Sequence, residues 1–455
     1  MAFNSLATDK NWQKYSLEEI CLKITSGGTP SRQNPKLYKN GNINWIKTKE
    51  LNNGYIFESE EKITEEAIKK SSAKLLPVNT ILLAMYGATV GELGILGKEM
   101  ACNQACCALI IDPKKADYRF IFYLLRLYKK EIQSLATGAA QQNLSAKTIK
   151  EFSFYIPNLE KQKKIADILS ELDKKIDLNT QINQTLEQIA QALFKSWFVD
   201  FDPVRAKVQA LSDGLSLEQA ELAAMQAISG KTPEELTALS QTQPDRYAEL
   251  AETAKAFPCE MVEVDGVEVP KGWELSTIGD CYDVVMGQSP KGETYNENKQ
   301  GMLFYQGRAE FGWRFPTPRL FTTDPKRIAE QNSILMSVRA PVGDINIALE
   351  KCCIGRGLAA LQHKSKNLSF GLYQIQSIKP ELDLFNGEGT VFGSINQANL
   401  KNIQIINPDE KFIQLFEKYL SSCDSKIMNN EIENNALKEI RDLLLPRLLS
   451  GEIQL

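Results

Sequence analysis

The sequence predicts an α+β protein in which two similar, strand-rich domains of mixed structure alternate with two long helices packed as an antiparallel coiled coil. Two observations lead to this prediction. Residues 158–199 carry apolar side chains at steps of three and four, which places one apolar stripe along one face of a helix. The same pattern recurs near the C-terminus, and the segments that precede the two helices share a skeleton of short strands and turns.

The first predicted helix is uninterrupted, because no Gly or Pro follows Pro157 within it. At ~1.5 Å per residue it spans roughly 60 Å, more than a single domain needs. An apolar stripe of this length needs a partner helix to cover it. The stripe consists of Ile165, Ile168, Leu169, Leu172, Ile176, Ile182, Leu186, Ile189, Leu193 and Trp197.

The partner predicted for this helix is the C-terminal segment, which repeats it in step. Asparagines on or beside an apolar stripe weaken a coiled coil but fix its register and orientation, and they recur in both segments. Two unrelated amphipathic helices are the alternative, and the agreement of several residue types argues against it. The matched pairs include Pro157 and Pro408, Ile165 and Phe416, Asp173 and Asp424, Asn179 and Asn430, and Asn183 and Asn434.

A small helical insert follows the first helix and is rich in Ala, Glu, Gln and Leu. Ser216 with Gln219, and Thr232 with Glu235, are typical of capped helix starts. The insert is either a solvated linker or an element that docks a partner. The predicted parts are a first domain (1–157), the first long helix (158–204), the helical insert (205–258), a second domain (259–408) and the second long helix (409–455).

Composition places the chain among ordinary globular proteins, with 455 residues and a net charge of −4. An N-terminus without an apolar signal core predicts a cytoplasmic location. Nine cysteines without a Cys-x-x-Cys pair indicate reduced, buried thiols. The single histidine, His363, stands in a polar string and is predicted to lie on the surface. The sequence therefore offers few histidine ligands for a zinc site and few histidines for a catalytic centre.

Catalytic motifs are missing from the sequence. There is no G-x-x-x-x-G-K-[ST] phosphate loop and no Gly-rich dinucleotide turn after a strand. The Asn/Asp-Pro-Pro-aromatic string that holds the target amine in amino-methyltransferases is also absent. These absences weigh against an enzyme, and we expect neither a catalytic residue nor a metal or cofactor site on this chain.

Nucleic-acid contacts are predicted instead, first from two glycine- and serine-containing loops. The loop Ser26–Ser31 has consecutive glycines, which let the backbone approach a ligand, and hydroxyls that suit phosphate oxygens. A plain tight turn is the equal alternative. The candidate residues are Gly28, Thr29 and Ser31 in the first copy, and Gln288, Ser289 and Lys291 in the second.

Polar and aromatic residues follow each loop. Arg can bind guanine in a bidentate manner and Lys can bind phosphate, whereas the aromatic residues alone also suit a core. Trp45 aligns with Tyr305 in this comparison of the two copies. The candidates are Trp45, Lys47 and Lys49 in the first domain, and Arg308, Arg314 and Arg356 in the second.

A further candidate pair lies on an apolar strand and its turn, where Tyr86 of the first domain matches Arg339 of the second. Polar tracts recur later in both domains, and Gln and Asn can bind adenine in a bidentate manner. They can equally cap the next element. The candidates here are Tyr86, Thr89, Gln141, Gln142 and Asn143 in the first domain, and Arg339, Ser394 and Asn396 in the second.

The chain resembles the specificity subunits of type I restriction-modification systems over nearly its whole length. The resemblance rests on the duplicated layout, on the SGGTPS loop followed by GNINWI, and on ALFKSWFVDFDPV at the end of the first helix. VPKGWE at the start of the second domain and LLPRLLSGEI near the C-terminus also match. The resemblance implies two target recognition domains that each recognise half of a split site in double-stranded DNA.

The resemblance further implies that the helices act as a spacer and dock methyltransferase subunits, two of which we expect. Those subunits would bring S-adenosylmethionine and the adenine chemistry, and a motor-nuclease restriction subunit would join for cleavage. Two other interpretations stay open at this point. One is an enzyme with an unrecognised site, and the other is an assembly scaffold without direct base recognition.

Overall fold

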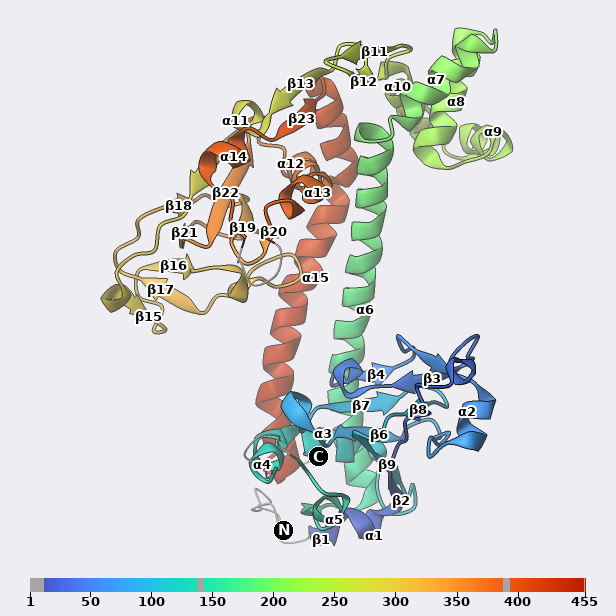
Figure 1. The fold of residues 1–455 in the computed structure, drawn as a ribbon, viewed down its shortest axis with the longest axis vertical. Helices are drawn as coiled ribbons and strands as arrows, with labels where there is room; N and C mark the ends of the chain where they lie inside the picture. Colours follow the sequence, from blue (N-terminus) through green and yellow to red (C-terminus); the bar gives the residue numbers. More distant parts are fainter. Residues whose placement is uncertain (1–11, 137–142, 388–392, 454) are drawn as a thin grey trace. The chain divides into compact units, whose positions relative to one another are not determined.

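The protein is described by a computed structural model that covers residues 12–136, 143–387, 393–453 and 455. It forms two compact units: residues 1–180 together with 431–455, and residues 181–430. Both boundaries lie inside long helices, so each unit holds one strand-rich domain and part of each helix (Figure 1).

The domain of the first unit contains a five-stranded sheet of order β2-β9-β6-β7-β4 and a three-stranded sheet of order β5-β3-β8. The central strand β6 is buried at every position and carries only apolar residues, as a strand covered on both faces requires. A separate two-stranded sheet pairs β1, near the start of the domain in the chain, with β10, near the end of the domain. The strands are β1 (Gln13–Ser16), β2 (Cys21–Ser26), β3 (Ile43–Ile46), β4 (Tyr55–Ile56), β5 (Lys62–Ile63), β6 (Ile81–Ala84), β7 (Leu93–Leu96), β8 (Ala101–Cys102), β9 (Cys106–Ile111) and β10 (Ser153–Ile156).

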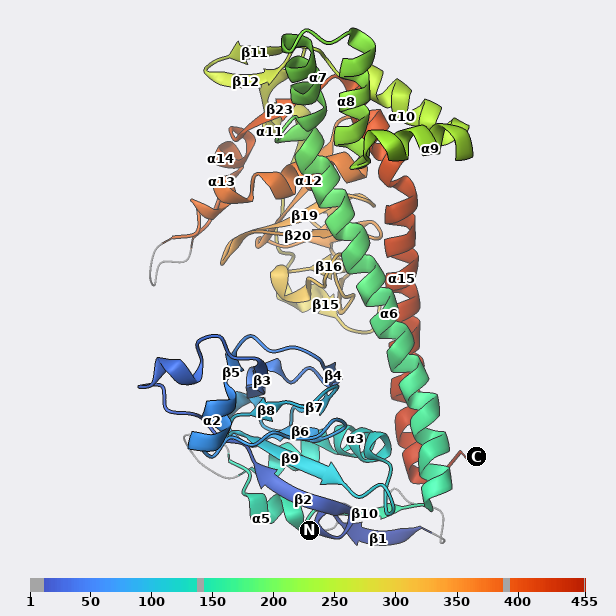
Figure 2. The same cartoon turned by 90° about the vertical axis from the view of Figure 1, so that its right-hand side faces the viewer.

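Helix α3 (Tyr118–Leu127) lies between the larger sheet and the long helices (Figure 2). Its residues Phe120 and Leu124 belong to one apolar core with Leu83 of β6, Leu169 of α6 and Leu445 of α15. The domain therefore packs directly on its part of the helix pair. Its other helices are α1 (Leu17–Ile20), α2 (Glu65–Lys70), α4 (Lys129–Ser134) and α5 (Ala146–Lys150).

The long helices are α6 (Leu159–Phe198) and α15 (Glu410–Ser450), and they run antiparallel. In the first unit, Asn179 Nδ2 donates to Asn434 Oδ1 over 3.1 Å. In the second unit, Asn430 Nδ2 donates to Asn183 Oδ1 over 2.8 Å. All four asparagines are buried, so the amides that interrupt the stripe bond to each other across the helix pair, as the predicted antiparallel coiled coil requires.

The buried seam of the helices differs in detail from the predicted stripe, because Ile168 and Ile189 are 36% and 52% exposed. The seam instead repeats every seven residues, and positions one step before a seam residue turn outward. In α6 the buried residues at this spacing are Leu169, Ile176, Asn183, Ala190 and Trp197, and in α15 they are Leu420, Ile427, Asn434, Arg441 and Leu448.

The helical insert consists of four helices, and the last three share a small apolar core. The capping boxes predicted at Ser216 and Thr232 are both present. Lys207 is buried, and its ammonium donates to the carbonyl oxygens of Ala254 (3.0 Å) and Phe257 (2.7 Å) at the end of the last helix. The helices are α7 (Asp202–Ser212), α8 (Leu217–Ser229), α9 (Pro233–Thr242) and α10 (Pro244–Ala256).

The domain of the second unit follows a hairpin, β11 (Met261–Val264) and β12 (Val267–Pro270). Like the first domain it contains two main sheets, but the numbers of strands in the sheets differ. Their orders are β14-β22-β19-β20 and β15-β17-β16-β21-β18. The remaining elements are β13 (Glu274–Thr277), α11 (Ile278–Cys281), β14 (Tyr282–Met286), β15 (Tyr295–Asn296), β16 (Met302–Tyr305), β17 (Leu320–Thr322), β18 (Ile328–Ala329), β19 (Ile334–Val338), β20 (Val342–Ile347), β21 (Cys352–Ile354), β22 (Leu358–His363), α12 (Leu368–Ser377), α13 (Lys379–Asp383), α14 (Gln397–Lys401) and β23 (Gln404–Asn407).

The predicted surface position of His363 is wrong, because only 6% of this residue is exposed. His363 ends strand β22, and its ring packs edge-on against Tyr282 and Phe370. Its Nδ1 lies 2.7 Å from Ser365 Oγ. Burial lowers the pKa of His363 to about 4. The polar string around it led to the wrong prediction, because the strand ends at the histidine and Lys364 lies in the turn that follows.

Candidate nucleic-acid interface

In the first unit, three separate chain segments meet where strand β6 ends. The backbone N–H of Met85 donates to the carbonyl of Ala105 over 2.8 Å, and the N–H of Leu144 donates to the carbonyl of Met85 over 2.9 Å. An antiparallel bridge between Tyr86 and Asn143 continues this contact. Backbone bonds therefore bring two predicted site residues from distant segments together.

The second unit repeats the arrangement at the end of strand β19. The N–H of Val338 donates to the carbonyl of Gly357 over 2.9 Å, and the N–H of Ile395 donates to the carbonyl of Val338 over 3.1 Å. The corresponding bridge joins Arg339 and Ser394. We call this shared set of backbone bonds the strand-end frame: Met85, Ala105 and Leu144 in the first unit, and Val338, Gly357 and Ile395 in the second.

Other candidates near the frames are partly occupied. Thr89 Oγ1 donates to the carbonyl of Tyr86 over 3.2 Å. Asn396 caps helix α14 by accepting from the N–H of Asn399 over 2.9 Å, so the capping alternative holds for this asparagine. Gln141 and Gln142 lie outside the described residues.

The two glycine N–H groups of the first loop are bonded within the domain and are not free to bind a phosphate. Gly28 is buried, and its N–H donates to the carbonyl of Cys102 over 2.9 Å. A Cβ on Gly28 would lie 2.3 Å from Ala73 N, so close packing requires the glycine. Trp45 is only 2% exposed, and its indole N–H donates to the Gly28 carbonyl over 2.9 Å. The structure thus corrects the DNA contacts predicted for Gly28 and Trp45, because both are packed in the core; Thr29 and Ser31 remain accessible.

The cations that follow this loop are balanced by nearby carboxylates. Lys47 and Arg32 both pair with Glu61, and Lys49 pairs with Glu60 over 2.5 Å. Arg32 and Lys47 lower the pKa of Glu61 to about 2, mainly through hydrogen bonds to its carboxylate. Lys47 and Lys49 therefore belong to a surface of mixed charge and not to an isolated basic patch.

The second loop lies against the turn that carries Arg356. The N–H of Gln288 donates to the carbonyl of Ile354 over 3.0 Å, and the N–H of Arg356 donates to Ser289 Oγ over 3.3 Å. Three predicted residues from two segments therefore form one surface, and Lys291 beside them is exposed.

Arg308 lies at a different place in the same domain. Its Nε pairs with Asp344 over 3.0 Å, and about half of its side chain is exposed. It lines a cleft of about 710 Å³ together with Lys195 and Lys379. The guanidinium is accessible, but one acceptor already holds it.

Comparison with known proteins decides what these repeated domains are. The family model for the type I restriction modification DNA specificity domain matches residues 9–188 and again 270–439. The chain belongs to the type I restriction-modification specificity subunit family. It is thus a DNA-recognition subunit, and the scaffold interpretation without DNA recognition is not favoured.

Two relatives of this specificity subunit match most of its length. It is 48% identical to the type I restriction enzyme HindI specificity subunit of Haemophilus influenzae over 363 residues, 73% of this chain and 77% of the relative. It is 27% identical to a putative type I restriction enzyme MjaX specificity subunit of Methanocaldococcus jannaschii, over 98% of this chain and 94% of the relative. The crystal structure of an S subunit from M. genitalium has the same fold, with a TM-score of 0.56, 17% identity, and coverage of 98% and 99% of the two chains.

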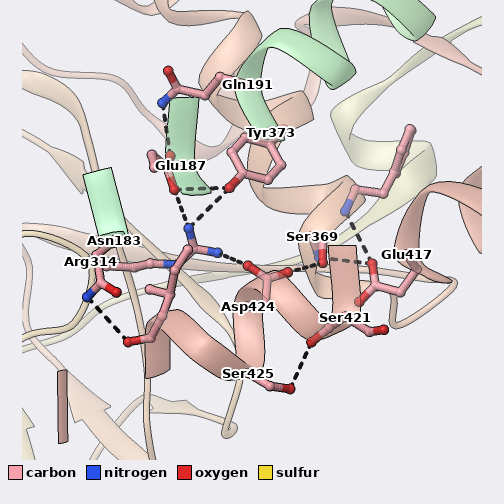
Figure 3. Close-up of polar contacts among 12 residues, drawn as sticks. Asn183, Glu187, Gln191, Arg314, Ser369, Tyr373, Glu417, Ser421, Asp424 and Ser425 are labelled. Carbon is pink, nitrogen blue, oxygen red and sulfur yellow. Dashed lines mark hydrogen bonds and ion pairs between the residues drawn. The ribbon is translucent and has the colours of Figure 1, made fainter. Parts of the chain in front are cut away.

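Arg314 of the specificity subunit is the clearest correction to the predicted DNA contacts, because this residue is only 5% exposed. Its guanidinium lies between Glu187 of α6 and Asp424 of α15 and pairs with both carboxylates (Figure 3). It also donates to Tyr373 Oη over 3.1 Å, and Tyr373 donates to Glu187 over 3.0 Å. A guanidinium satisfied in this way holds the loop after β16 on the helices and cannot reach a base.

In the first unit, the carboxylate at the matching position pairs with a cation from helix α15 and not with one from a loop. Asp173 is the repeat counterpart of Asp424, and it accepts from Arg441 of α15 over 2.7 Å. Tyr123 of α3 donates to the same carboxylate over 2.7 Å. The repeat counterpart of Arg441 in the second unit is Ala190, which leaves room for the loop arginine there.

Metal-binding clusters and membrane-spanning helices are both absent from the described residues of the specificity subunit. Across 12–136, 143–387 and 393–453, no group of three or more His, Cys, Asp or Glu side chains could hold a metal ion. Among the helices that the structure describes, none is long and apolar enough to cross a membrane.

The sequence analysis missed one exposed residue near the first strand-end frame, Gln104. This residue lies in the turn that precedes the apolar run CCALII.

Proposed function

We propose that this specificity subunit recognises a bipartite site in double-stranded DNA, with each domain binding one half-site. The observation that supports this proposal is the strand-end frame, which both domains build from the same backbone bonds. The side chains on the frame differ, with Tyr86 and Asn143 in one domain and Arg339 and Ser394 in the other. One scaffold with two unlike surfaces suits two half-sites of different sequence.

The helices would set the distance between the half-sites. Helix α6 has 40 residues and a length of about 60 Å, more than one DNA turn of about 34 Å. We therefore expect base pairs between the half-sites that are spanned and not recognised.

The outward faces of the helices would dock two methyltransferase subunits. Exposed apolar side chains on a helix that already has its seam partner indicate an interaction surface. The docked subunits would carry S-adenosylmethionine and the adenine chemistry, a motor-nuclease subunit would join for cleavage, and the complex would act in the cytoplasm. The exposed side chains are Ile168, Leu178, Ile432, Ile440 and Leu443 in the first unit, and Ile189 and Met428 in the second.

Methylation mapping in a host that carries the subunit with its methyltransferase subunits tests the proposal. We expect modified adenines in a two-part motif with an unread spacer. Replacing residues 1–157 with the same segment of a relative should change one half of the motif only. Inserting seven residues into both long helices should lengthen the spacer and leave both half-sites unchanged. A continuous motif, or half-sites that change with helix length, would contradict the proposal.

A further inference from the structure

The turn between β8 and β9 in the first domain is built like the turn between β21 and β22 in the second. The N–H of Asn103 donates to the carbonyl of Ile46 over 2.9 Å, and the N–H of Gly355 donates to the carbonyl of Tyr305 over 2.8 Å. Ile46 is therefore the counterpart of Tyr305, one residue beyond the predicted match with Trp45, and Asn103 is the counterpart of Gly355.

The far side of each turn is fixed by the strand-end frame. Met85 donates to the carbonyl of Ala105 in one domain, and Val338 donates to the carbonyl of Gly357 in the other. Because both flanking residues match, the single residue between them matches as well. Gln104 of the first domain therefore occupies the position that Arg356 occupies in the second.

Both of these tip residues are exposed, and among the residues described neither side chain has a hydrogen-bond or ion-pair partner. The backbone beneath Arg356 is tightly packed, since a Cβ on Gly355 would lie 2.7 Å from the Gln306 carbonyl. Each turn is thus held by backbone hydrogen bonds on both sides of its tip residue, and the side chain of that residue points to solvent-accessible space.

The two frames differ in charge. Tyr86, Gln104 and Asn143 leave the first frame neutral, whereas Arg339 and Arg356 make the second cationic. Arg308, Arg314 and Arg319 of the second domain pair with carboxylates, whereas Arg327, Arg339 and Arg356 form no ion pair with any residue that the structure describes. Of these three, only Arg339 and Arg356 lie at the frame.

We infer that Gln104 and Arg356 are equivalent base-contacting residues, Gln104 binding an adenine in the first half-site and Arg356 a guanine in the second. Gln and Asn side chains match the N6 and N7 atoms of adenine, and Arg matches the O6 and N7 atoms of guanine in the major groove. This inference rests on the proposed bipartite recognition and adds the bases that each domain selects. Arg339 beside Arg356 supplies a second cation to the same half-site.

Selection from a randomised duplex library by the full subunit, assembled with its methyltransferase subunits, tests the inference. Gln104→Ala should lower the preference for adenine at one position of the first half-site roughly tenfold or more and leave the second half-site unchanged. Arg356→Ala should do the same for one guanine of the second half-site. Gln241→Ala and Arg246→Ala, exposed changes in the insert, should leave both half-sites as in the wild type.

Arg356→Lys separates base recognition from phosphate binding, because Lys keeps the charge and loses the bidentate geometry. We expect it to lose the guanine preference while overall affinity falls less than in Arg356→Ala. An unchanged guanine preference in Arg356→Lys, an unchanged profile in Gln104→Ala, or a wild-type second half-site without a G·C pair would overturn the inference. If the wild type selected no two-part sequence at all, the proposed function itself would fail, and the inference with it.

Discussion

The guanidinium of Arg314 and the carboxylate of Asp424 form a buried ion pair that binds a loop of the second domain to helix α15. The side chain of Arg314 is 5% exposed and that of Asp424 is 21% exposed, so the loss of either partner leaves the other charge mostly out of water. Burial raises the pKa of Asp424, and the nearby Arg314 opposes that rise.

Arg314→Met should destabilise the second unit by about 3–5 kcal/mol, because Glu187 and Asp424 would remain mostly buried without their cation. Urea unfolding followed by tryptophan fluorescence measures the loss. Arg327→Met, which changes an exposed arginine with no ion pair among the described residues, is the matched control and should cost less than about 1 kcal/mol. Equal effects of the two changes would mean that the buried cluster does not hold this loop.

Gly28→Ala should destabilise the first domain, because the new methyl group would overlap the backbone of Ser72 and Ala73. We expect a loss of about 1–3 kcal/mol, the usual cost of forcing extra atoms into a packed site. Thermal unfolding measures it. Gly292→Ala is the control, since nothing lies within 4 Å of its added Cβ. If the two variants melted alike, the glycine loop would not be tightly packed.

His363→Gln should remove part of the acid sensitivity of the second unit. Folding lowers the pKa of His363 from 6.5 to about 4, so the unfolded chain binds a proton first as the pH falls. Stability is therefore complete above about pH 6.5 and declines between pH 6.5 and 4, by at most about 3 kcal/mol. The free energy of unfolding, measured for both proteins across this range, should differ in slope. Parallel slopes would contradict the neutral buried ring.

Replacing Asn179 and Asn434 together by Leu should stabilise the helix pair and weaken its register. The two amides bond to each other in the seam, and apolar residues at such positions favour association over a single alignment. We expect a higher melting temperature together with mixed association states in sedimentation experiments. Asn435→Leu, at an exposed position on the same helix, is the control. A single, unchanged association state would show that other contacts fix the register.

The sequence was sufficient for the helix pair, because its seam repeats in two places and Asn179 and Asn183 recur with it. The seven-residue spacing of the seam, which buries Ala190 and exposes Ile189, was harder to predict. Adjacent apolar residues fit an apolar stripe equally well until the position of the partner helix is known.

Individual site residues were harder to predict for a different reason. A cluster of arginines in the sequence does not reveal that Arg314 meets Glu187 and Asp424 from distant segments, while Arg339 meets neither. Gln104 was passed over because its equivalence to Arg356 is visible only in the backbone bonds on either side of each turn. Contacts between residues far apart in the chain carry this information, and local patterns do not.

The strand-end frame has a consequence for how such a protein diverges. Its bonds run entirely between main-chain atoms, so the frame does not depend on which side chains the turn tips carry. If Gln104 and Arg356 contact bases as we infer, a single codon change at either position changes the DNA sequence that the subunit selects and leaves the backbone bonds of the frame intact.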